Sequence, residues 1–105
     1  RLHLAVDTGL GREGLAPREV AAGARLVAER GPHWQLAGVF TKWCCAEDAR
    51  AMRAARRVFS ASSRMALRLA RRGRAASPLV HVGGGLGSAG WAVAELPRPW
   101  LVRIG

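Results

Sequence analysis

The 105-residue sequence lacks the features of a membrane, secreted or disulfide-stapled protein. No apolar run approaches the ~18 residues of a transmembrane helix. The N-terminus has no basic region followed by an apolar one, so no signal peptide is expected, and the missing initiating Met fits a fragment. The two cysteines, Cys44 and Cys45, are adjacent, and a disulfide between neighbours is strained. With no further Cys there is no disulfide framework or zinc quartet, and a reducing cytoplasm is expected.

Acidic residues are few and lysine is almost absent. The sequence contains seven Asp and Glu residues and seventeen Lys and Arg residues, which gives a net charge of +10. All of these basic residues except Lys42 are Arg. A charge of this size ordinarily points to nucleic acid or another anionic surface. Abundant Ala and Gly accompany the Arg, as a GC-rich coding sequence would impose. A basic binding module is therefore kept as the alternative function.

Apolar patterning predicts four strands alternating with helices. The strands are expected at residues 2–6, 34–40, 78–82 and 100–104. A first helix opens at Ala16-Pro17 and stops at Gly31-Pro32; a long second helix starts at Glu47-Asp48, and residues 91–96 allow a short third one. Such alternation implies an α/β fold with a parallel sheet. Four such units make half of a TIM-type (β/α)8 barrel, with residues 1–105 as one partial barrel domain; the resemblance described below implies that it is the C-terminal half.

The long helix has two distinct faces. Its apolar stripe is formed by Met52, Ala55, Phe59, Ala66 and Leu69. Arginines occupy much of the other face, at positions 50, 53, 57, 64, 68 and 71. This Arg face is expected to be the solvated outside of a barrel helix, and Ser60 to Ser63 are expected to weaken the middle of the helix.

Two glycine strings follow predicted strands and could cradle a ligand. Gly9, Gly11 and Gly14 lie between a strand and a helix, as in a dinucleotide fingerprint. The second strand, however, ends at Thr41-Lys42 without the acidic residue that would bind a ribose. The second string, Gly85 to Gly90, precedes a segment broken by Pro97. A dinucleotide site is therefore the weaker interpretation.

Four segments resemble, in order, motifs of the alanine racemase family. Residues 6–14 are similar to its strand-turn "VDTGMGRLG", and residues 36–41 to its strand "LEGVFTHF". Residues 78–81 match the start of "PLVHAANSA", and residues 101–105 match "VRPGIALYG". The resemblance implies the last four strands of a barrel that holds pyridoxal phosphate, in a homodimeric enzyme that interconverts L- and D-alanine for the cell wall.

The resemblance also implies roles for individual residues. Arg103 matches the arginine that faces the pyridine nitrogen of the cofactor, and His81 matches the histidine that supports this arginine. Arg12 matches the turn arginine near the substrate carboxylate. Gly85 and Gly105 lie where the phosphate-binding loops follow the last two strands.

Other positions depart from the family pattern. Ala5 replaces a strand lysine, Lys42 replaces a pocket histidine, and Gly84-Gly85 replace the Asn-Ser pair that meets the phosphate. The family's cofactor-binding lysine lies on the first barrel strand and its catalytic tyrosine in a C-terminal domain, outside the matched motifs. We therefore expect no catalytic residue within the chain and no racemase activity from it alone.

Some of these residues also have purely structural interpretations. His81, flanked by apolar residues, suits a satisfied core histidine. His3 and His33 are expected at the surface. The four tryptophans, Trp34, Trp43, Trp91 and Trp100, are expected in the core or at an interface, and Cys44-Cys45 as small buried residues.

Overall fold

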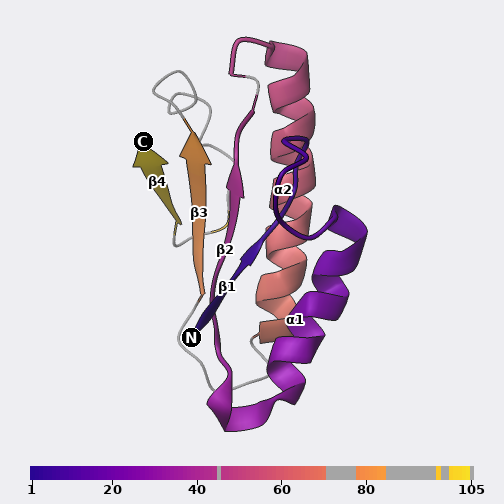
Figure 1. The fold of residues 1–105 in the computed structure, drawn as a ribbon, viewed down its shortest axis with the longest axis vertical. Coiled ribbons are helices and arrows are strands. Elements are labelled where there is room, and N and C mark those ends of the chain that lie inside the picture. The colour runs from indigo at the N-terminus through magenta and orange to yellow at the C-terminus, as the bar shows by residue number, and fades with distance from the viewer. Residues whose placement is uncertain (45, 71–77, 85–96, 98–99, 105) are drawn as a thin grey trace.

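The computed structural model describes residues 1–44, 46–70, 78–84, 97 and 100–104. They form a four-stranded sheet of β1 (Leu2–Ala5), β2 (Leu36–Lys42), β3 (Leu79–Gly84) and β4 (Trp100–Ile104). The strands lie in chain order and every neighbouring pair is parallel. The helices α1 (Val20–Glu29) and α2 (Ala49–Ala70) lie together on one side of the strands (Figure 1). The predicted α/β fold with a parallel sheet is confirmed.

Element boundaries differ from the expected ones where local turns intervene. Short 3-10 turns, Pro17–Glu19 and Gly31–His33, flank α1, and the second delays the start of β2 to Leu36. β1 ends at Ala5; Val6 still donates its N–H to the Phe40 carbonyl, 2.8 Å away, and forms an isolated bridge with Leu15 after the turn. The expected short helix 91–96 lies outside the described residues.

The long helix α2 runs unbroken through its serines, so the weakening expected at Ser60 to Ser63 does not interrupt it. Ser63 Oγ donates to the carbonyl of Phe59, 2.7 Å away, which satisfies the buried hydroxyl inside the helix. At the start, Asp48 Oδ1 accepts the backbone N–H groups of Arg50 and Ala51 at 2.9 and 3.0 Å. A capped start and internally bonded serines thus let one continuous helix span the sheet.

The core lies between the helices and one face of the sheet. Val39 of β2 and Val80 and Val82 of β3 are buried there, with Met52 and Phe59 of α2. Burying such side chains stabilises the fold by roughly 1.5–3 kcal/mol each. Because strand residues alternate between faces, their neighbours in sequence point to the other face. That second face, which carries no described helix, is called here the open face.

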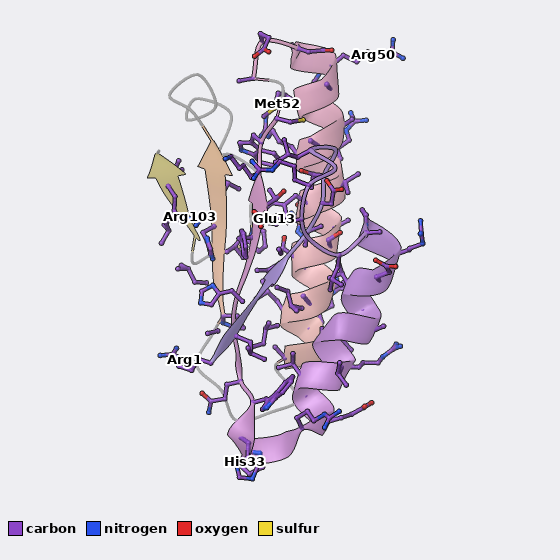
Figure 2. The ribbon with its side chains drawn as sticks, in the orientation of Figure 1. Arg1, Glu13, His33, Arg50, Met52 and Arg103 are labelled. Atoms are coloured by element: carbon purple, nitrogen blue, oxygen red, sulfur yellow. The ribbon has the colours of Figure 1, made fainter. Side chains whose placement is uncertain are left out.

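The outer surface of α2 is strongly basic. Its arginines at positions 50, 53, 57, 64 and 68 are exposed, as expected, while Arg71 lies outside the described residues. Arg50 projects away from the protein at the first turn of α2 (Figure 2). None of the helices within the described residues is long and apolar enough to cross a membrane.

Candidate functional site

The turn after β1 is stabilised by hydrogen bonds that one carboxylate accepts. Asp7 Oδ1 accepts the backbone N–H groups of Gly9 at 2.9 Å and Gly11 at 3.1 Å. These two bonds favour the charged form and hold the pKa of Asp7 below its ordinary value. Gly14 has a φ of +110°, and a Cβ there would meet the Asp7 nitrogen at 2.8 Å. Glycine at position 14 is therefore required by the closed turn.

Two threonines tie this turn to the neighbouring strand. Thr41 Oγ1, on β2, donates to the carbonyl of Val6 at 2.8 Å. Thr8 Oγ1 lies 2.9 Å from Thr41 Oγ1, and because the Thr41 proton is already used, Thr8 is the donor of this pair. The turn is thus fixed at the carboxyl ends of β1 and β2, where α/β folds place ligands.

A small pocket opens at the same edge of the sheet. It is lined by side chains from β1, its turn and β2, namely Ala5, Val6, Asp7, Leu10, Glu13, Phe40, Thr41 and Lys42. The pocket brings together Ala5 and Lys42, two of the positions at which the sequence departs from the racemase motifs. It also adds Glu13, which the motif comparison did not single out. Arg12 is exposed on the adjoining turn.

On the open face, a cation and three rings gather above β2. The guanidinium carbon of Arg103 lies 5.0 Å from the centroid of the Phe40 ring, at cation–π distance. The His81 ring stacks on Phe40 from β3, with centroids 5.0 Å apart and an interplanar angle of 10°. The His3 ring meets His81 edge-on at 5.0 Å. Figure 2 shows Arg103 beside β3 and β4, away from the two helices.

Two glycines make room for this cluster. Gly38 pairs with His3 in the parallel register, and a Cβ there would collide with the His3 ring and lie 2.8 Å from the Leu79 carbonyl. Gly83 pairs with Arg103, and a Cβ there would lie 3.2 Å from Arg103 Nη2. The bare backbone at both positions lets side chains from the outer strands reach the middle of the sheet.

His81 is the buried polar centre of the cluster. Its Nε2 lies 2.8 Å from His3 Nδ1, at hydrogen-bond distance. Its Nδ1 is buried and has no hydrogen-bond partner among the described residues. Burial, followed by the positive charge of Arg103 and the proximity of His3, lowers the pKa of His81 from 6.5 to about 4. The ring is therefore neutral at pH 7.

The structure places some predicted site residues together and leaves others apart. His81 and Arg103 share the open face, whereas Arg12 is exposed on the turn after β1. Gly85 and Gly105 lie outside the described residues. The expectation that His3 lies at the surface is confirmed, since it is exposed, but its ring also contacts His81, which the sequence did not predict. His33, in contrast, is exposed in the turn at the far end of the molecule (Figure 2).

Neither His3 nor Phe40 was singled out from the sequence as part of a site. The usable signal was the period-two alternation, which puts His3 and Phe40 on one face of the sheet with His81. Of the tryptophans, Trp43 is buried and Trp34 is exposed, while the side chains of Trp91 and Trp100 lie outside the described part. Cys44 is half-buried, and Cys45 is not described. Within the described ranges, no three His, Cys, Asp or Glu side chains gather as a metal site would require.

Comparisons with known proteins agree with the motifs. A crystal structure of alanine racemase from Corynebacterium glutamicum matches with a TM-score of 0.60 and 28% sequence identity. The match covers 82% of this chain but 23% of the racemase, so the chain spans well under half of that enzyme's length. No curated protein matches the sequence significantly. The family model "Alanine racemase, N-terminal domain" matches residues 1–105, and the chain therefore belongs to this family.

Proposed function

We propose that this chain is the second half of the barrel of a pyridoxal-phosphate-dependent racemase that interconverts L- and D-alanine. The observation that carries the proposal is the position of Arg103, whose guanidinium lies over Phe40 on the open face, beside the neutral ring of His81. A fixed cation at the carboxyl-terminal part of a parallel strand suits the pyridine nitrogen of the cofactor. Residues 1–105 would then be a partial barrel domain whose open face is the barrel interior.

The sheet geometry supports a half-barrel. Its four strands lie in chain order and in parallel, and both described helices cover the same face. A barrel requires this arrangement, because its helices form an outer ring while the inner face is filled by side chains. The racemase from Corynebacterium glutamicum provides the matching fold.

The residues present fit one end of the cofactor. Arg103 remains cationic at any physiological pH, so it would keep the pyridine nitrogen unprotonated, which favours racemisation over other pyridoxal reactions. His81, whose buried Nδ1 has no hydrogen-bond partner among the described residues, is suited to hold Arg103 in place. Pyridoxal phosphate, when bound, supplies the electron sink that makes the Cα proton of an amino acid acidic. We assign Arg12 to the substrate carboxylate, and Gly85 and Gly105 to the phosphate loops.

The proton transfers need groups beyond residues 1–105. The sequence contains no tyrosine and a single lysine, Lys42, which lines the pocket at the end of β2. The resemblance puts the cofactor-binding lysine on the first barrel strand and the catalytic tyrosine in a further domain of a homodimer. We therefore propose a cytoplasmic racemase that is active only as a complete barrel. The DNA upstream of this segment should encode that lysine if the chain is a fragment, and should lack it if the chain is a remnant.

The test is a chimaera in which residues 1–105 replace the matching segment of the Corynebacterium glutamicum racemase. The chimaera is expected to form D-alanine from L-alanine, whereas the isolated chain with added pyridoxal phosphate is expected to form none above a protein-free control. Substituting Arg103→Gln in the chimaera should lower kcat/KM about 10- to 100-fold, because a charge-assisted hydrogen bond contributes about 1.5–3 kcal/mol.

The matched control is Arg57→Gln, which removes one exposed arginine from α2 and should leave kcat/KM unchanged. A folded chimaera that binds the cofactor yet is indifferent to Arg103→Gln would contradict the role of Arg103. D-alanine production by the isolated chain would contradict the requirement for a complete barrel.

A further inference from the structure

His3 reaches across a whole strand to contact His81. It lies on β1 and His81 on β3, so β2 separates them, yet His3 Nδ1 and His81 Nε2 are 2.8 Å apart. The contact is possible because Gly38, between them on β2, has no side chain to block the His3 ring. His3 is thus paired with a glycine that accommodates its ring, and His81, two residues further along the sheet opposite Phe40, is the partner for its ring nitrogen.

The pair leaves one open question, namely which ring carries the shared proton. One proton is shared in a hydrogen bond between the two ring nitrogens, so either His81 Nε2–H donates to His3 or His3 Nδ1–H donates to His81. In the first case His81 Nδ1 is a bare lone pair, and in the second it carries a proton. The protonation of one ring nitrogen is set by the bond that the other makes.

The cations on the open face favour the first arrangement. Arg103 projects from β4 over Phe40, and Lys42 lies at the end of β2 in the same row as Gly83 and Arg103. A lone pair at the buried Nδ1 is attracted by positive charge, whereas an N–H dipole pointing outwards is repelled. A bare Nδ1 can also accept an N–H from the Arg103 guanidinium, which has five donors and no acceptor.

We propose that His3 is a positioning residue: its Nδ1 accepts the Nε2–H of His81, which fixes His81 as the Nε2–H tautomer and keeps the buried Nδ1 free to accept from Arg103. This inference rests on the proposed function for its catalytic meaning, because Arg103 is the group that would face the cofactor. The tautomer itself can be measured in the chain without cofactor. His3 does not touch the reacting atoms and acts through His81.

The experiment is long-range ¹H–¹⁵N spectroscopy of the histidine rings in the full 105-residue chain at pH 7. The expected spectrum shows His81 with a protonated Nε2 and an unprotonated Nδ1. In His3→Phe, which keeps a ring but removes the acceptor, both His81 nitrogens should move toward the average of two exchanging tautomers. His3→Asn, whose amide oxygen can accept from Nε2–H, should restore the wild-type pattern in part.

Two further variants separate the contact from general damage. Gly38→Ala retains both histidine residues, but its Cβ would collide with the His3 ring and displace it. A folded Gly38→Ala variant should therefore reproduce the His3→Phe spectrum. His33→Phe removes an exposed histidine in the distant turn and should leave the His81 signals unchanged. A wild-type spectrum with His81 protonated at Nδ1 would overturn the proposal, as would identical His81 signals in wild type and folded His3→Phe.

The same variant in the racemase chimaera gives the catalytic readout. His3→Phe should lower kcat with little effect on KM, and should move the acid limb of the kcat profile, because a less restrained His81 binds a proton at higher pH. An inactive chimaera would count against the proposed function while the tautomer measurement still stands. An active chimaera whose kcat and pH profile ignore His3→Phe would overturn the positioning role.

Discussion

Close contacts between side chains of distant strands define the open face at the level of single residues. Arg103 and His3 extend over the open face from the two edge strands, β4 and β1. Arg103 passes Gly83 to reach the Phe40 ring, and His3 passes Gly38 to reach the His81 ring. A guanidinium, two imidazole rings and a phenyl ring are thereby packed together. Burial and the nearby positive charge of Arg103 lower the pKa of His81, so its neutral form is strongly favoured.

The lowered pKa of His81 predicts how the free energy of unfolding depends on pH. The pKa of His81 is lowered from 6.5 to about 4, so between these values the unfolded chain binds a proton that the folded chain does not. Stability is therefore fully present above pH 6.5 and is lost as the pH falls toward 4. One whole proton corresponds to a slope of about 1.4 kcal/mol per pH unit, which is the upper limit for this contribution.

The measurement is urea unfolding at a series of pH values between 4 and 7. His81→Phe should flatten the loss of stability in this window, whereas His33→Phe, at an exposed site, should keep the wild-type slope. An unchanged slope in folded His81→Phe would show that His81 is not the group responsible.

Residue-level prediction from the sequence succeeded where the information was local or carried by a motif. His81 and Arg103 were identified because they lie within motif segments, and the structure brings them to one face. The role of His3 could not be predicted in this way, because its partner lies 78 residues away and the contact exists only once β1, β2 and β3 are aligned in register. Glu13 was missed for the same reason, since the pocket it lines is completed by β2.

At the scale of elements, apolar periodicity located every strand and both long helices, but their ends depended on hydrogen bonds. β2 starts at Leu36 because the chain first turns through Gly31–His33, and β3 continues through Gly84, beyond the expected end at residue 82. The serines of α2 show how far propensity carries. It predicts a weak middle, yet the helix runs unbroken, and the Ser63 hydroxyl is bonded to the carbonyl of Phe59 in the preceding turn.

The Arg face of α2 gives a test of the alternative function. Its five exposed arginines are expected to bind duplex DNA only non-specifically, with Kd in the range of about 10⁻⁴–10⁻⁶ M and no sequence preference. Each phosphate contact contributes about −0.9 to the slope of log affinity against log salt. The double variant Arg53→Gln/Arg57→Gln should therefore reduce this slope by about 2 if both arginines contact phosphates.

Titrations at several salt concentrations, with fluorescently labelled duplexes of unrelated sequence, provide the measurement. Arg25→Gln serves as the control, because it removes one positive charge from the exposed side of α1, outside the Arg face of α2. Submicromolar and sequence-dependent binding at physiological salt would favour the binding module over the racemase half-barrel.

At the scale of the whole molecule, the described sheet has two unpaired edges. In the order β1-β2-β3-β4, the first and last strands each pair on one side only within the described residues, and the open face bears no described helix. In a complete barrel both edges would be closed by the remaining strands and the open face would be interior. An isolated half-barrel should therefore associate through these surfaces.

We expect the isolated chain to form concentration-dependent oligomers, as measured by light scattering after size-exclusion chromatography. Leu101 lies on the edge strand β4, and its side chain is 37% exposed. A charge on an edge strand disfavours pairing with another sheet, so Leu101→Lys should shift the distribution toward the monomer. Leu26→Lys, at an exposed position of α1 away from the edge, should leave association unchanged. A sharp monomer peak at every concentration, combined with a cooperative melt, would contradict the half-barrel, because a closed and self-sufficient domain has no edges to pair.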